Sequence, residues 1–168
     1  MPELSHGLFE KMRLVSGAKF YGHLTSSSAV STKEKAPYRV LLARRPTFVK
    51  PGDTVVTNGA EVVILMDHPD DYPWAASFKA VYALEQFTWS RNTFVVDPVS
   101  KVKKDSGDTP LGKLYVNFDM AEELNTFGFQ DTKYRFITGQ DVQVGDKIDE
   151  YVVKRIVKSL GVKVVFVA

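Results

Sequence analysis

The 168-residue sequence contains no cysteine. Without thiols the chain has no thiol nucleophile, no zinc–thiolate site and no disulfide scaffold. A chain of this length buries about 70% of its unfolded surface, so it needs neither a metal nor a disulfide to fold. The absence of cysteine fits a reducing compartment.

The sequence also lacks a strong excess of charge of either sign. Its formal net charge of +2 and its pI near 8.7 are too small to predict nucleic-acid binding on their own. No apolar run is long enough to cross a bilayer, and the N-terminus does not show the basic-then-apolar pattern of a signal peptide. We therefore expect a soluble, intracellular protein with no membrane partner.

Catalytic signatures are missing as well. The sequence has no Gly-rich phosphate loop, no Gly-x-Ser-x-Gly elbow and no His-Glu-x-x-His motif. One histidine, His68, lies among carboxylates (Asp67, Asp70 and Asp71), a composition that suits metal binding or acid–base chemistry. No second cluster completes such a site, and prolines in the segment are typical of a solvated loop. We predict a non-enzyme without cofactor or metal, and keep a metal-dependent hydrolase at these four residues as an alternative.

What the sequence does contain is a strong hairpin signal at residues 48–68. Lys50-Pro51-Gly52-Asp53 has the chemistry of a type II turn, because Pro51 presets φ at the second position and Gly52 allows a positive φ at the third. A β-branched run then leads to Asn58-Gly59, which predicts a two-residue type I′ turn. An apolar strand follows at residues 60–66.

The same turn pattern returns near the end of the chain. Residues 142–148 (Val-Gln-Val-Gly-Asp-Lys-Ile) echo residues 49–55 (Val-Lys-Pro-Gly-Asp-Thr-Val). Other strands are expected to add to these two units, at 38–43, 93–96, 114–118, 133–138, 150–159 and 162–168. The apolar run at 162–168 must lie inside a sheet or be covered by a neighbour, because an open apolar edge templates aggregation.

Two segments fit both helix and strand. In residues 1–24, apolar residues at helical spacing predict a short helix or arm that leads into a strand at 19–24. Residues 78–91 suit a helix or a bulged strand, and their aromatic density favours the strand. Residues 120–125 suit one helical turn. The predicted fold class is mainly β: a small β-barrel or β-sandwich with mobile loops and at most one or two short helices.

Residues 25–37 are the one clear break in composition. Serine, threonine and a Lys-Glu-Lys run leave almost nothing apolar to bury, which predicts a mobile surface loop. The functional alternative is an arm that orders against a neighbouring subunit, through Ser26, Ser27, Ser28, Lys33, Glu34 and Lys35. We divide the chain into an N-terminal segment with this loop (residues 1–37) and a β-domain (residues 38–168).

Two basic clusters are candidates for contacts with phosphate or DNA. Arg44-Arg45 ends a predicted strand, and Lys101, Lys103 and Lys104 lie in a predicted polar tip. Both clusters are also typical of ordinary solvated positions. Aromatic and basic residues interleave at Phe87–Arg91, as on single-strand binding platforms, although such aromatics in a β-module are more often part of the core.

Three stretches resemble small head-to-tail connector proteins of tailed bacteriophages, of the head-closure (stopper or collar) kind. They are Val49–Val55 leading to Ile64–His68, Thr88–Arg91 followed by Asp97–Val99, and Gly145–Arg155 closing with Leu160–Val165. The resemblance covers roughly half of the chain, from about residue 40 onward. Residues 1–37 have no counterpart in it.

The resemblance implies a β-barrel or β-sandwich subunit of a homo-oligomeric ring, six- or twelvefold, in the neck of the virion. Its implied partners are further copies of itself, the portal or an adaptor protein, tail proteins and transient double-stranded DNA, with assembly in the host cytoplasm. Such a ring joins the capsid to the tail and lines or closes the DNA channel. One of the two basic clusters would face this channel. The competing hypothesis is an OB-like module that binds single-stranded nucleic acid.

Overall fold

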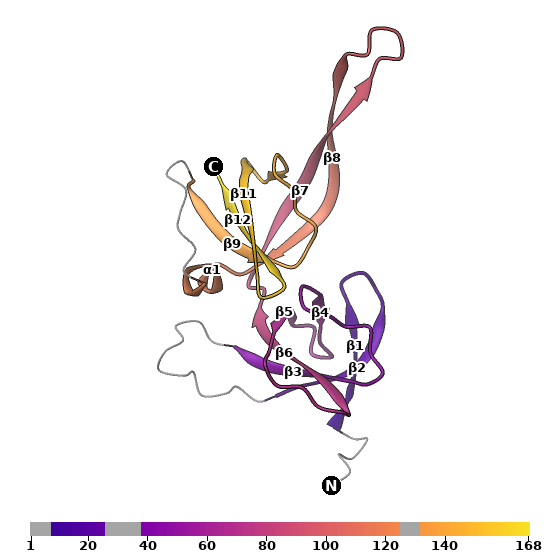
Figure 1. Cartoon of the computed structure of the whole chain (residues 1–168), viewed down its shortest axis with the longest axis vertical. Coiled ribbons are helices and arrows are strands. Elements are labelled where there is room, and N and C mark those ends of the chain that lie inside the picture. The colour runs from indigo at the N-terminus through magenta and orange to yellow at the C-terminus, as the bar shows by residue number, and fades with distance from the viewer. Residues whose placement is uncertain (1–7, 26–37, 125–131) are drawn as a thin grey trace.

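A computed structural model describes residues 8–25, 38–124 and 132–168 (Figure 1). These residues form twelve strands and one short helix: β1 (Glu10–Leu14), β2 (Lys19–Leu24), β3 (Arg39–Arg44), β4 (Thr54–Val56), β5 (Val62–Asp67), β6 (Ala75–Tyr82), β7 (Glu85–Val96), β8 (Lys103–Val116), α1 (Asp119–Glu123), β9 (Tyr134–Thr138), β10 (Lys147–Ile148), β11 (Tyr151–Ser159) and β12 (Val162–Val167). The mainly β fold class is confirmed. Within the described ranges, no helix has the length and apolar character that a bilayer span requires.

Strands β1 to β6 form a closed antiparallel barrel in the order β1-β2-β3-β6-β5-β4, which we name the first barrel. Strands β7 to β12 form a six-stranded sheet in the order β8-β7-β10-β11-β12-β9. An antiparallel bridge between Asn117 and Ile137, with backbone N···O distances of 3.1 and 2.9 Å, joins the two ends of this sheet. The sheet is therefore also rolled up, and we name it the second barrel.

The two barrels share one strand order. When β7 to β12 are set against β1 to β6 in sequence, every strand pair of the first barrel has a counterpart in the second. For example, β1 pairs with both β2 and β4, and β7 pairs with both β8 and β10. The chain is thus a tandem repeat of one six-stranded topology.

Side-chain alternation along the strands builds three apolar cores. On β5, Val63 and Leu65 belong to the core of the first barrel, whereas Ile64 and Met66 belong to a core shared with the second barrel. Residues of β12 alternate in the same way between the shared core and the core of the second barrel. Strands buried on both faces read as continuous apolar runs, which explains the sequences of β5 and β12. Since β12 lies between β11 and β9, its edges need no covering neighbour.

Three glycines let the backbones of the two barrels touch. Gly52, in the first barrel, lies against Gly139 and Gly161 of the second. A Cβ on Gly139 would lie 1.8 Å from the carbonyl oxygen of Gly52, and a Cβ on Gly161 would lie 2.3 Å from the Cβ of Pro51. No side chain fits at these positions. The predicted Pro51-Gly52 turn is therefore also a point where the backbones of the two barrels meet.

The predicted hairpin is present as β4 and β5, but its connecting turn differs from the prediction. The left-handed residue is Ala60, with φ of 62°, and Gly59 does not have a positive φ. The N–H of Thr57 donates to the carbonyl of Glu61 at 2.9 Å. Three residues therefore connect the strands, and the predicted two-residue type I′ turn is wrong. A three-residue loop that ends in a left-handed residue is another common hairpin connection.

The N-terminal prediction is wrong in part. Residues 10–14 form β1 rather than a helix, because pairing with β2 and β4 closes the first barrel. The predicted strand at 19–24 is confirmed. Residues 78–82 and 85–91 are strand, in β6 and β7 respectively. Since β1 and β2 belong to the first barrel, a division after residue 37 does not follow the strand pairing.

Candidate assembly and nucleic-acid surfaces

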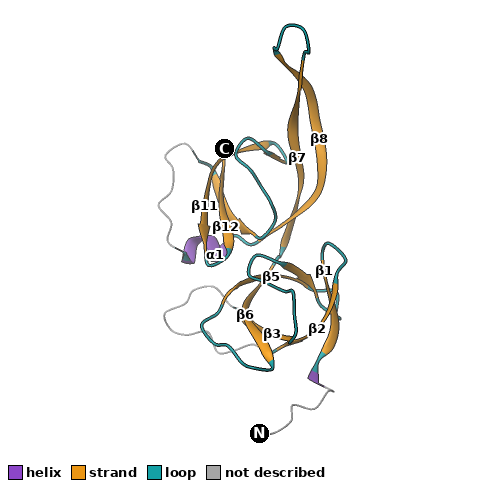
Figure 2. Ribbon diagram, turned by 45° about the vertical axis from the view of Figure 1, so that its right-hand side comes forward, coloured by secondary structure: helices purple, strands orange, loops and turns teal. Residues whose placement is uncertain are grey.

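The β7–β8 hairpin projects from the second barrel as a long two-stranded arm (Figures 1 and 2). Strand β10 pairs with β7 only at Trp89 and Ser90, and beyond these residues the described strands offer the hairpin no further neighbour. Gly107 and Gly112, with φ of 91° and 107°, accompany two register shifts between β7 and β8. Such bulges increase twist and disfavour edge-to-edge pairing.

Exposed apolar side chains cover the projecting part of the hairpin. Val99, in the turn at residues 97–102, is 90% exposed, and Phe94 on β7 is 58% exposed. The complete set of exposed large apolar residues on the hairpin is Phe94, Val95, Val96, Val99, Val102 and Leu111. A gathering of exposed apolar residues on a projecting element is typical of an interaction site.

The turn at the end of this hairpin is held by its own hydrogen bonds. The Asp97 carboxylate accepts the N–H groups of Val99 and Ser100 at 2.8 and 3.2 Å, and Lys104 Nζ lies 3.5 Å from it. The two backbone hydrogen bonds hold the pKa of Asp97 below its ordinary value. The turn therefore presents Val99 in a conformation that its own polar groups define.

The predicted lysine cluster lies at this end of the hairpin. Lys101 is in the turn, and Lys103 and Lys104 begin β8. Lys104 pairs with Asp97, whereas no ion pair within the described part of the chain involves Lys101 or Lys103. The turn is at residues 97–102, so Lys103 and Lys104 lie on a strand and not in the polar tip where they were predicted.

A buried carboxylate fixes the root of the hairpin. Asp146 accepts Trp89 Nε1 at 2.9 Å, Arg91 Nε and Nη2 at 2.8 and 2.9 Å, and the Gln143 N–H at 2.9 Å. Burial raises the pKa of Asp146, but the hydrogen bonds from Arg91, Trp89 and Gln143 outweigh it, so the pKa lies below its ordinary value. The hydrogen bond with Asp146 also raises the pKa of Arg91.

Sequence analysis missed this contact. The spacing of Trp89 and Arg91, which puts both side chains on one face of a strand, was the available signal. Their common partner, Asp146, is separated from them by more than 50 residues, and only the pairing of β7 with β10 brings it close. Trp89 is also part of the core of the second barrel. The interleaved residues Phe87–Arg91 are thus engaged within the protein.

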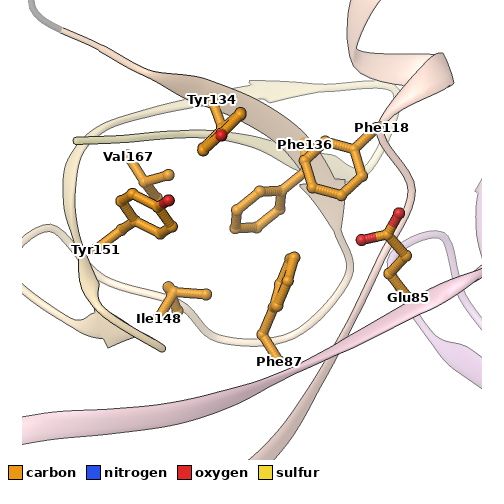
Figure 3. Close-up of a pocket in the computed structure, with 8 residues that line it drawn as sticks. All are labelled: Glu85, Phe87, Phe118, Tyr134, Phe136, Ile148, Tyr151 and Val167. Carbon is orange, nitrogen blue, oxygen red and sulfur yellow. The ribbon is translucent and has the colours of Figure 1, made fainter.

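An apolar pocket of about 390 Å³ lies in the second barrel (Figure 3). Its three phenylalanines, Phe87, Phe118 and Phe136, have ring centroids 5.9 Å apart in every pair. Tyr134 and Tyr151 meet edge to face at 5.3 Å. The full lining is Glu85, Phe87, Phe118, Tyr134, Phe136, Ile148, Tyr151 and Val167, and we name it the aromatic pocket.

Charged groups lie on two sides of the aromatic pocket. Glu85 is on the opposite side from Tyr134 and Tyr151 (Figure 3). Lys133 Nζ lies 5.6 and 5.3 Å from the ring centroids of Tyr134 and Tyr151. A hydrogen bond with Glu150 raises the pKa of Tyr151 to about 12, and burial and Tyr134 act in the same direction. The phenol is therefore neutral at physiological pH, and Glu85 supplies the carboxyl group of the lining.

The other predicted basic pair lies in the first barrel. Arg45 pairs with the Asp71 carboxylate, and its Nε donates to the Tyr72 carbonyl at 3.0 Å. Arg44 lines a hollow of about 320 Å³ next to exposed aromatic side chains. The basic and aromatic residues of this hollow are Lys19, Phe20, Tyr21, Arg44, Arg45 and Phe48. Because the hairpin projects from the far side of the second barrel, the two predicted basic clusters lie at opposite ends of the molecule (Figure 1).

Two of the four predicted metal-binding residues lie together, with His68 Nδ1 3.9 Å from the Asp70 carboxylate. His68 Nδ1 accepts the N–H of Asp70 at 3.3 Å and lies 3.1 Å from Ser77 Oγ. The Asp71 carboxylate forms an ion pair with Arg45. Across residues 8–25, 38–124 and 132–168, no group of three or more His, Asp or Glu side chains is placed to hold a metal ion.

The predicted intersubunit arm, at Ser26, Ser27, Ser28, Lys33, Glu34 and Lys35, lies outside the described residues. No known protein-family model, no curated protein and no solved structure matches this chain. Its function is therefore argued from the surfaces described above.

Proposed function

We propose that this protein is a structural subunit of a homo-oligomeric ring, of the head-to-tail connector kind found in the neck of tailed bacteriophages. The observation that carries the proposal is the β7–β8 hairpin, which holds Phe94, Val99 and other apolar side chains in water. Burial of apolar surface contributes roughly 25 cal/mol per Å², so these side chains favour an assembled state over an isolated chain.

The architecture suits a ring subunit. Two barrels with a shared core form one elongated body, and the hairpin projects from one of its ends (Figure 2). Such a body presents different surfaces on its different sides, as the head-to-tail contacts of a closed ring require. The resemblance to connector proteins supports the specific kind of ring; it lies in residues 49–55 with 64–68, 88–91 with 97–99, and 145–155 with 160–165.

Within this proposal, the hollow beside Arg44 is the surface that we assign to DNA. Lys19 and Arg44 supply positive charge there, whereas Arg45 is already paired with Asp71. Two basic side chains give only a weak, salt-dependent attraction to phosphates, which suits DNA that must move past the protein.

A second candidate function is binding of single-stranded nucleic acid by an OB-like module. The specific observation in its favour is that Tyr21 and Phe48, which are 51% and 54% exposed, lie in the same hollow as Lys19 and Arg44. Exposed rings beside basic side chains can stack on bases. The residues first considered for this role, Phe87–Arg91, carry less of it, because Trp89 and Arg91 are engaged by Asp146.

Native mass spectrometry and cryo-electron microscopy test the proposal, with the protein alone and mixed with a portal encoded in the same genome. A closed ring is the expected result. A protein that stays monomeric at high concentration and ignores the portal would overturn the proposal. Binding of single-stranded DNA at low and high salt separates the second candidate, since an OB-like module binds tightly at low salt and loses affinity steeply as salt rises.

A further inference from the structure

The aromatic pocket and the hairpin turn have complementary chemistry. The pocket offers aromatic and aliphatic carbon on most of its surface, with Glu85 at one side. The turn offers two exposed valines, Val99 and Val102, with Lys101 between them and Lys103 next to them. Apolar groups can enter such a pocket, while a lysine at its rim meets a carboxylate.

The hairpin of a given chain cannot fill the pocket of the same chain. Phe87, which lines the pocket, and Val96, where β7 ends, are nine residues apart on one strand. At about 3.3 Å per residue, the turn lies about 30 Å from the pocket. The hairpin also extends away from the barrel rather than folding back over it (Figures 1 and 2). If this turn fills the pocket, it is the turn of another copy.

We infer that the β7–β8 turn of one copy inserts Val99 and Val102 into the aromatic pocket of the next copy, with Lys101 or Lys103 beside Glu85. The inference rests on the proposed function, because it specifies the contact that would close the ring. The turn and the pocket are different surfaces of one chain, so the contact is heterologous and continues from copy to copy until the rotation closes.

Charge sets the orientation of the inserted turn. Lys133 lies over the rings of Tyr134 and Tyr151, and Glu150 hydrogen-bonds to Tyr151, so opposite charges offset each other on that side of the pocket and do not attract the turn lysines. Glu85 attracts them on the opposite side. Like and opposite charges at an interface fix its register more than they add to its affinity. The valines supply the affinity, and the charged groups select one way of docking.

Cysteine cross-linking tests the contact without background, because the natural chain has no thiol. A chain with Val99→Cys, carrying a mass tag, is mixed with an untagged chain with Glu85→Cys and oxidised. We expect a disulfide-linked dimer of one tagged and one untagged chain. The matched control is Val144→Cys in place of Val99→Cys, at a valine that is 63% exposed and lies on neither the hairpin nor the pocket. Equal yields from the two mixtures would overturn the inference.

A substitution of the turn separates this inference from the proposed function. Val99→Asp puts a carboxylate into the pocket, and we expect the concentration needed for ring assembly to rise at least about tenfold. Val144→Asp, the same change at the control valine, should leave assembly unchanged, and circular dichroism checks that both variants fold. If the natural ring forms and Val99→Asp assembles equally well, the inference fails and the proposed function stands. If the natural protein forms no ring at all, both fail.

Discussion

The two barrels contain the same Gly-Asp turn and share its backbone hydrogen bonds. Gly52 and Gly145 both have φ of 94°. The N–H of Gly52 donates to the Leu65 carbonyl at 2.7 Å, and the N–H of Gly145 donates to the Val153 carbonyl at 2.9 Å. In turn, the N–H of Leu65 donates to the carbonyl of Asp53 at 3.0 Å, and the N–H of Val153 donates to the carbonyl of Asp146 at 2.9 Å. Local sequence thus dictates the same turn twice.

The surroundings of the two turns differ. In the first barrel, the backbone of Gly52 touches the other barrel, and the Asp53 side chain accepts the local N–H of Lys50 at 2.9 Å. In the second barrel, a Cβ on Gly145 would meet no atom of the described residues within 4 Å, while the buried Asp146 holds the root of the hairpin. One turn thus joins the barrels through its backbone, and the other fixes the projecting arm through its side chain.

Alanine at the two turn glycines should separate these roles most strongly. Gly52→Ala and Gly145→Ala both place alanine in the left-handed region, which costs about 1–2 kcal/mol. At Gly52 the new Cβ would also lie 2.7 Å from the carbonyl oxygen of Gly161, and overpacking of this kind adds about 1–3 kcal/mol. In urea unfolding, we expect Gly52→Ala to lose about 2–5 kcal/mol and Gly145→Ala about 1–2 kcal/mol.

Gly17→Ala is the control for the backbone penalty alone, because Gly17 has φ of 103° and open space around its Cβ direction. Its loss should match that of Gly145→Ala. If Gly52→Ala costs no more than these two variants, the barrels can move apart at the glycine contact without loss of stability, and the contact does not join them.

Alanine at the two aspartates should give the opposite ranking. Asp146→Ala leaves the Arg91 guanidinium and the Trp89 N–H without their acceptor, and loss of one partner of a buried ion pair costs about 3–5 kcal/mol. Because the Arg91 side chain is 30% exposed and can turn to water, we expect about 2–3 kcal/mol in urea unfolding. Asp53→Ala removes a local turn hydrogen bond and should cost about 0.5–1.5 kcal/mol.

Limited trypsin digestion gives a second readout of the aspartate variants. Cleavage after Lys101 and Lys103 should become faster in Asp146→Ala, because the root of the hairpin is released, and should not change in Asp53→Ala. Equal losses of stability in the two variants, with equal cleavage rates, would mean that Asp146 serves only its own turn.

Local chemistry made the hairpin, the two Gly-Asp turns and most strands predictable. Turn residues and side-chain alternation act over a few positions, and the sequence displays them directly. The closure of each barrel was not predictable, because it depends on pairs such as β1 with β4 and Asn117 with Ile137. Residues 10–14 became a strand for the same reason: the pairing partner, not the local spacing, decides.

The sequence also did not predict that the β7–β8 hairpin projects from the barrel. Phe94, Val95 and Val96 read as an ordinary core strand, because a β-branched and aromatic run does not reveal whether anything covers it. The polar composition of residues 25–37 predicted a surface loop, with an intersubunit arm as the functional alternative. An apolar arm that waits for a partner and an apolar strand in a core have the same composition.

Acid unfolding should have the smallest effect of these experiments on the second turn, since it protonates the Asp146 carboxylate rather than removing it. The pKa of Asp146 is lowered in the folded protein, so its stabilising effect is complete above the unfolded value of about 3.9 and is lost as pH falls through the folded value. Between about pH 4 and pH 2, the natural protein should therefore lose stability that Asp146→Asn has already lost at neutral pH. Asp97 and Asp105 also have lowered pKa values, but Asp146 does not contribute to them, so their contributions cancel in the difference. The charge of Asp146 raises the pKa of Asp141, so the difference also includes the response of Asp141 to the loss of that charge. If Asp146→Asn loses as much stability over this range as the natural protein does, the acid response does not come from Asp146.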